Sequence, residues 1–140
     1  MKKIVLLSLR GRQAYQDQDP DTIELITEGT LEQTEGGWEI SYQETALTGM
    51  EGVSTTFRVE PDKIILTRTG KLNSQMIFRE GEVHESLYQM EFGALMISVM
   101  AAKIRWNITE KGGTVDLLYA IEIENSASGT VDYHLDIQVR

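Results

Sequence analysis

The chain of 140 residues contains no cysteine, only two prolines and only two histidines. Without cysteine there can be no disulfide bond, no thiolate nucleophile and no thiolate metal site. Basic residues are scarce as well, since 13 Lys and Arg stand against 22 Asp and Glu, which gives a net charge of −9. This balance argues against binding to nucleic acid or to anionic membranes.

Long apolar runs are also missing. The N-terminal apolar segment, residues 4–9, ends at Arg10 and is shorter than the ~7–15 residues of a signal-peptide core. No segment approaches the ~20 apolar residues of a transmembrane helix. We therefore interpret the N-terminal segment as the first strand of one domain, residues 1–140, and expect a cytoplasmic protein.

Alternation of apolar and polar residues dominates the sequence. It is clearest in residues 115–123 and 131–139, where every second side chain is apolar, as in a strand with one buried face. About ten such runs fit between turn signals such as Glu35–Gly37, and they leave no room for a substantial helix. Short sequential connections predict an all-β fold, an antiparallel up-and-down β-barrel of about 8–10 strands, because closure removes the exposed sheet edges.

Four short motifs follow one another along this strand pattern, in residues 36–44, 67–70, 75–78 and 88–95. They read GGWEISYQE, TRTG, QMIF and YQMEFGAL. With these motifs the chain, from about Gly29 to Arg140, resembles the YwiB-like family of small uncharacterised bacterial proteins. The resemblance implies a calycin-type, lipocalin-like β-barrel, and it implies no established activity.

One arginine stands out as a candidate site residue. Arg68 has the same strand parity as Ile64 and Leu66, which places it on the inward face, where a lone charge is too costly. Its counter-charge is either a protein carboxylate, which makes the arginine structural, or an anionic group of a ligand. The side chains that we expect to line the lumen with it are Tyr88, Met90, Met96 and Tyr119.

The resulting hypothesis is a non-enzymatic barrel that binds a small, partly apolar ligand, with or without an anionic group, in its lumen. The alternative is an interaction or scaffold protein that has a packed lumen and acts through its outer surface. A lumen cavity of ~300 Å³ or more favours the first. No nucleophile elbow or phosphate-binding loop is present, which favours binding over catalysis.

No metal and no cofactor are predicted. His84 is expected to point inward and His134 outward, so the two histidines do not share a site. Four acidic residues follow the spacing of a calcium-binding loop: Asp17, Asp19, Asp21 and Glu28. The glycine that such a loop needs at its sixth position is replaced by Thr22, so a solvated acidic turn is the favoured interpretation.

The segment Ala94–Ala102 is apolar on both faces. A barrel strand normally keeps one polar face, so something is expected to cover the outer one. We assign Leu95, Ile97 and Val99 to that outer face and expect a homodimer that forms through them.

Overall fold

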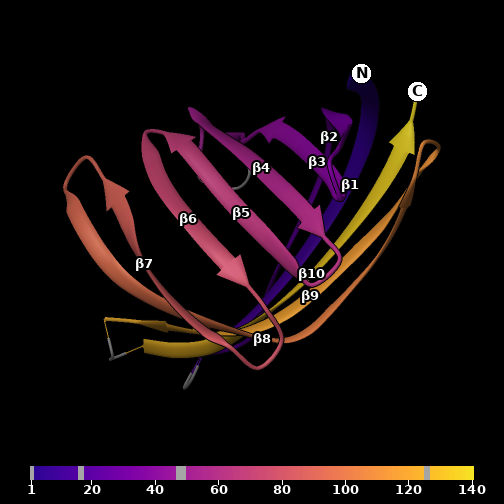
Figure 1. Ribbon diagram of the computed structural model, residues 1–140. Helices are drawn as coiled ribbons and strands as arrows, with labels where there is room; N and C mark the ends of the chain where they lie inside the picture. The colour runs from indigo at the N-terminus through magenta and orange to yellow at the C-terminus, as the bar shows by residue number, and fades with distance from the viewer. Residues whose placement is uncertain (1, 16–17, 47–49, 125–126) are drawn as a thin grey trace.

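The computed structural model describes residues 2–15, 18–46, 50–124 and 127–140. Ten strands make up the fold: β1 (Lys2–Tyr15), β2 (Asp21–Thr34), β3 (Gly37–Gln43), β4 (Val53–Glu60), β5 (Lys63–Gly70), β6 (Leu72–Phe78), β7 (Val83–Met90), β8 (Gly93–Thr109), β9 (Gly112–Ile123) and β10 (Ala127–Val139). Each strand pairs with the next, and β1 closes the barrel onto β10 (Figure 1). The predicted all-β, up-and-down antiparallel barrel is confirmed.

The alternation seen in the sequence sets the inside and the outside of the wall. On β4 the side chains of Val53, Thr55, Phe57 and Val59 are buried, while those between them are more exposed. The same holds on β5, where Ile64, Leu66 and Arg68 are buried. The buried faces of the strands, of which β7 has none, surround a shared axis and form a single apolar core, and burial of this core is the main favourable term in folding.

Strand β8 contains a bulge that exchanges its two faces. Its pairing with β9 shifts between Ala101 and Lys103. Before the bulge the odd-numbered residues point inward, whereas after it Ile104, Trp106 and Ile108 pack against the core. The bulge is held by the β6–β7 turn, where Gly81 N donates to Ala101 O at 3.0 Å and Glu80 Oε2 accepts from Ile104 N at 2.8 Å.

The face assignment made for β8 from the sequence was wrong. Ile97 and Val99 are 3% and 2% exposed, and Leu95 lines an internal cavity. Met96 and Met100, expected inside, lie on the outer face and are 38% and 39% exposed. A segment that is apolar on both sides carries no local signal of which side faces the core, so neighbouring strands decide it.

The wall is weakest between β6 and β7. Only two residue pairs connect these strands, Leu72 with Met90 and Asn73 with Gln89. Further along, Ile77 N donates to the Nδ1 of His84 at 3.4 Å, so a side chain takes the place of a backbone acceptor. Within the described ranges, no helix has the length and apolar content needed to traverse a bilayer.

Candidate functional site

A cavity of about 190 Å³ lies inside the barrel and contains part of the predicted site. It is lined by Gln13, Tyr15, Met50, Arg68, Met76, Tyr88, Leu95, Ile97, Tyr119, Ile121, Ile123, Val131 and Tyr133. A smaller hollow of about 70 Å³ shares Gln13, Met50 and Tyr133 with it and reaches Glu44. The two hollows together form a lumen with apolar walls and a polar end.

Arg68 supplies the charge at this polar end. Its side chain is 5% exposed, and its Nε lies 4.0 Å from the Oε2 of Glu44, whose own side chain is 1% exposed. The carboxylate of Glu44 also accepts a hydrogen bond of 2.5 Å from the Thr55 hydroxyl. The counter-charge of Arg68 is therefore a protein carboxylate and not an anionic group of a ligand, which is the first of the two alternatives that the sequence left open.

The guanidinium nevertheless has donors to spare. Within the described part of the chain its one hydrogen bond runs from Nη2 to the Tyr133 hydroxyl, at 3.4 Å, and its Nε has no hydrogen-bond partner. Ser74, the register partner of Arg68 across β5 and β6, has a buried hydroxyl that also lacks a partner, as does Ser86 on β7. These atoms are three of the four buried side-chain polar atoms without a partner in the described residues. An arginine has five N–H donors, so the site can still bind acceptor oxygens.

All five tyrosines of the chain surround the lumen. Burial raises the pKa of Tyr119 and Tyr42, and the pKa of Tyr42 is raised further by Glu44, to which its hydroxyl is hydrogen-bonded. Burial alone would lower the pKa of Arg68, but Tyr133 and the other tyrosines around it outweigh burial and leave that pKa above its ordinary value. The guanidinium is therefore charged, and these two phenols neutral, at any ordinary pH.

The aromatic rings support one another at this end of the lumen. The rings of Tyr119 and Tyr133 stack with their centroids 6.4 Å apart, and the ring centroid of Phe78 lies 4.5 Å from that of Tyr119. Phe57 meets Tyr133 edge-on at 6.2 Å. Such contacts hold large side chains in fixed orientations, so the hydroxyl groups are presented to the cavity in a defined arrangement.

The structure brings together three of the five residues that the sequence proposed for the site. Arg68, Tyr88 and Tyr119 line the cavity. Met90 and Met96 do not: Met96 lies on the outer face and is 38% exposed, whereas Met90 shares the inward parity of Tyr88 but lies at the end of β7 and is 39% exposed.

Three residues that sequence reasoning missed share the site. Tyr15 and Tyr133 line the cavity, and Glu44 lines the smaller hollow. Tyr133 shares the apolar parity of β10 and could have been found by that signal. Glu44 follows the last residue of β3, where strand parity gives no firm expectation.

Comparison with known proteins identifies the family. A family model described as "Domain of unknown function (DUF1934)" matches residues 7–137. The chain belongs to this family. The crystal structure of the ywiB protein from Bacillus subtilis superposes with a TM-score of 0.89, covering 99% of this chain and 93% of that one at 18% identity. No curated protein matches. The YwiB-like resemblance and the closed-barrel fold are thus confirmed, whereas at this identity the similarity shows the fold alone.

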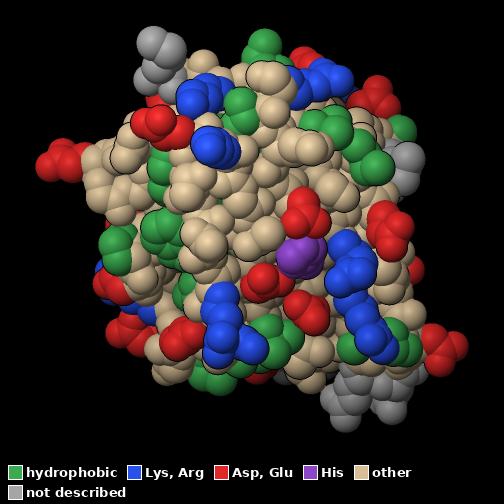
Figure 2. All heavy atoms as spheres, turned by 90° about the vertical axis from the view of Figure 1, so that its right-hand side faces the viewer, with side chains coloured by type: hydrophobic (Ala, Val, Ile, Leu, Met, Phe, Trp, Pro, Cys, Tyr) green, Lys and Arg blue, Asp and Glu red, His purple; other side chains and the backbone are tan. Residues whose placement is uncertain are grey.

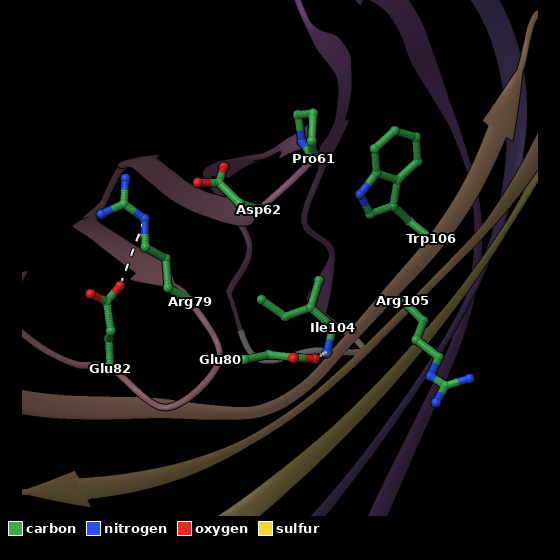
Figure 3. A pocket seen from close by; sticks show the side chains of 8 residues that line it. All are labelled: Pro61, Asp62, Arg79, Glu80, Glu82, Ile104, Arg105 and Trp106. Atoms are coloured by element: carbon green, nitrogen blue, oxygen red, sulfur yellow. Dashed lines mark hydrogen bonds and ion pairs between the residues drawn. The ribbon is translucent and has the colours of Figure 1, made fainter.

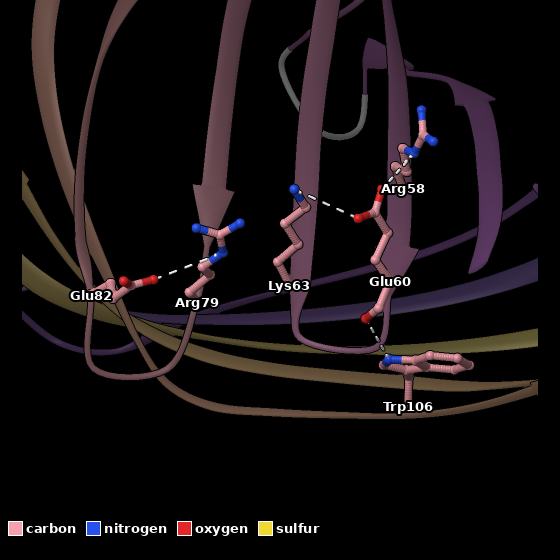
Figure 4. A network of polar contacts seen from close by, with 6 residues as sticks. All are labelled: Arg58, Glu60, Lys63, Arg79, Glu82 and Trp106. Atoms are coloured by element: carbon pink, nitrogen blue, oxygen red, sulfur yellow. Dashed lines mark hydrogen bonds and ion pairs between the residues drawn. The ribbon is translucent and has the colours of Figure 1, made fainter. Parts of the chain in front are cut away.

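In this family member a larger hollow, of about 960 Å³, lies outside the lumen. It is an open groove between the β4–β5 turn, the β6–β7 turn and β8, where Figure 3 shows Arg105 pointing away from Ile104 and Trp106. Some of its polar groups are already paired (Figure 4). The Nε of Arg79 lies 3.8 Å from the Oε2 of Glu82, and Trp106 Nε1 donates a hydrogen bond to the Glu60 carbonyl of β4 at 3.1 Å. We therefore place the candidate site in the lumen, where buried donors lack partners, rather than in this groove.

The outer wall of β9 and β10 holds an ionic cluster around His134, which lies on the outer face as expected. Its Nδ1 is 2.6 Å from Asp116 and its Nε2 is 3.1 Å from Asp136, and Figure 2 shows a histidine among acidic side chains. The hydrogen bond to Asp116 is the main cause of a raised pKa for His134. In the residues that the structure describes, no three His, Asp or Glu side chains are placed to hold a metal. Asp17 of the acidic turn lies outside the described residues.

Proposed function

We propose that this protein is a binding protein that holds a small, partly apolar molecule in the barrel lumen, with the polar end of the ligand at Arg68. The observation that carries the proposal is a buried guanidinium, 5% exposed, that faces an internal cavity with most of its donors unused. Buried donors without a partner cost free energy, which a ligand with acceptor oxygens recovers.

The size of the cavity limits the ligand. A volume of about 190 Å³ does not reach the ~300 Å³ that we set from the sequence as favouring lumen binding, so the proposal rests on the polar groups and is restricted to a ligand below drug size. It has room for about six water molecules, at the ~30 Å³ that each occupies in the liquid, or for an organic molecule of similar size. The side chains of Met76, Leu95 and Ile97 supply apolar lining in the same cavity as the hydroxyl groups, which suits a ligand with one polar end.

Native mass spectrometry of freshly purified protein tests this proposal directly. We expect a small molecule bound to the wild type and absent from Ile97→Phe, which fills the cavity from β8. The matched control is Ile26→Phe, at a residue that is 70% exposed, and it should keep the ligand. Wild-type protein without any bound molecule, and with no thermal stabilisation by a panel of small organic fragments, would reject lumen binding.

A second candidate function uses the outer surface. The outward side chains of the β7–β8 hairpin form an apolar face in which Val83 pairs with Met100 and Leu87 with Met96. Val83 is 65% and Leu87 45% exposed, so both apolar pairs are open to solvent, with Glu85 and Ser98 paired between them. We propose that a second copy of the chain packs on it, in place of the interface first expected through Leu95, Ile97 and Val99.

Sedimentation velocity at tens of micromolar tests the homodimer. We expect a dimer for the wild type and a monomer for Leu87→Lys, because a buried unpaired charge is costly at the centre of an interface. Thr22→Lys, at an exposed residue of β2 on the other side of the barrel, is the control and should remain dimeric. A monomeric wild type would reject this candidate without affecting lumen binding.

We further propose that the barrel is of the calycin type and that the protein works in the cytoplasm. An up-and-down closed barrel with an internal cavity supports the first proposal, since ligand-holding barrels share this arrangement. The absence of cysteine supports the second.

A further inference from the structure

We infer that the lumen selects an uncharged ligand with a carbonyl or similar acceptor oxygen, and that it discriminates against carboxylates and phosphates. This inference rests on the proposed lumen binding and narrows the chemical class of the ligand. It concerns the balance of charge at the polar end of the cavity, where Arg68 and Glu44 face one another.

The positive charge of the site is already neutralised. Glu44 lies 4.0 Å from Arg68, and both side chains are almost completely buried, so no bulk water separates them from the cavity. The Glu44 carboxylate is held in place by the Thr55 hydroxyl at 2.5 Å and by a hydrogen bond from Tyr42. A guanidinium and a carboxylate at this distance present a net charge of zero to an incoming ligand.

An anionic ligand would add a second negative charge to this pair. Its oxygens would have to approach the same guanidinium that faces Glu44, and two carboxylates that share one cation repel each other strongly where water is excluded. An uncharged ligand avoids this penalty. Dianionic phosphates are disfavoured still more, because the lining of the cavity contains no second cation among the described residues.

Hydrogen-bond donors nevertheless remain in excess. Arg68 uses one donor, toward Tyr133, and its Nε has no hydrogen-bond partner. The tyrosines that line the larger cavity have one O–H donor each, whereas Tyr42 gives its own to Glu44. A carbonyl oxygen accepts two hydrogen bonds without bringing a charge, so it matches the surplus of donors and the neutral pair together.

Calorimetric titration of the full chain with benzamide and with benzoate tests the inference at pH 7, because the two probes share size and shape and differ in charge. We expect benzamide to bind about tenfold more tightly or better. Glu44→Gln keeps the shape and removes the negative charge, so it should reverse the order and favour benzoate. The control Glu24→Gln makes the same charge change at an exposed residue of β2 and should leave the order unchanged.

The outcomes separate this inference from the proposal on which it rests. Equal or tighter binding of benzoate by the wild type would overturn the selection for an uncharged ligand while leaving lumen binding intact. No binding of either probe, together with no co-purified molecule, would reject lumen binding itself. If Glu44→Gln does not fold, the comparison of the two probes on the wild type still decides the inference.

Discussion

Replacement of Arg68 by methionine is the most informative perturbation of the buried ion pair. It leaves Glu44 buried, with a side chain that is 1% exposed and no cation beside it. Removing one partner of a buried pair costs about 3–5 kcal/mol. The separation of 4.0 Å is at the long end of an ion pair, and Glu44 keeps its hydrogen bond from Thr55, so the loss should be near the lower limit. Methionine also removes donors that had no partner, so we expect a net loss of about 2 kcal/mol.

Urea unfolding at pH 7, followed by tryptophan fluorescence, measures this loss. Arg68→Met combined with Glu44→Gln should be within about 1 kcal/mol of the wild type, because the stranded carboxylate is gone. Arg10→Met, at an exposed residue of β1, should change stability by less than about 0.5 kcal/mol.

Two results would refute the reasoning on the pair. A neutral or stabilising Arg68→Met would mean that the unliganded barrel is strained by an uncompensated cation, and that the counter-charge comes from a ligand. A double variant as unstable as the single one would mean that the loss comes from packing around Arg68, not from the charge of Glu44.

Three further predictions concern other parts of the wall. His134 has a raised pKa in the folded protein, so its charged form stabilises the fold. This contribution to the free energy of unfolding is fully present below pH ~6.5 and is lost as the pH rises through the folded pKa. Because the His134 side chain is 30% exposed and its partners Asp116 and Asp136 are 49% and 56% exposed, solvent screens the pairs, and the advantage of wild type over His134→Gln in urea should be only about 0.5 kcal/mol at pH 5.5 and smaller at pH 8.5. An advantage that does not change with pH would contradict this. Gly37→Ala should destabilise by more than about 2 kcal/mol, because its Cβ would lie 1.9 Å from a β4 carbonyl oxygen. Gly36→Ala is the control, because a Cβ at Gly36 would meet no atom within 4 Å and only the φ of +83° disfavours alanine there. A loss of melting temperature as large as that of Gly37→Ala would contradict the steric argument. Trp106→Phe should lower the free energy of unfolding in urea by about 1 kcal/mol, because the part-buried Glu60 carbonyl loses the indole N–H that it accepts from. An unchanged unfolding midpoint would show that water replaces this donor.

Much of the fold follows from the sequence because strand alternation and turn chemistry are local. The period of two in residues 115–123 and 131–139 defines β9 and β10 without any knowledge of their neighbours. The same parity places Arg68, Tyr88 and Tyr119 inside the barrel, where the structure has them. Closure also follows, because a meander of this length has two edges to protect.

The tertiary structure alone decided three further features. Ile97 faces inward and Met96 outward, because both faces of β8 are apolar in this segment and only its pairing with β7 and β9 determines which face is buried. The tertiary structure brought Glu44, which follows β3, to Arg68 on β5 across the intervening strand β4, a contact that no sequence spacing predicts. It also set the lumen at about 190 Å³, because the space left inside a barrel depends on how all the inward side chains pack, and not on any one strand.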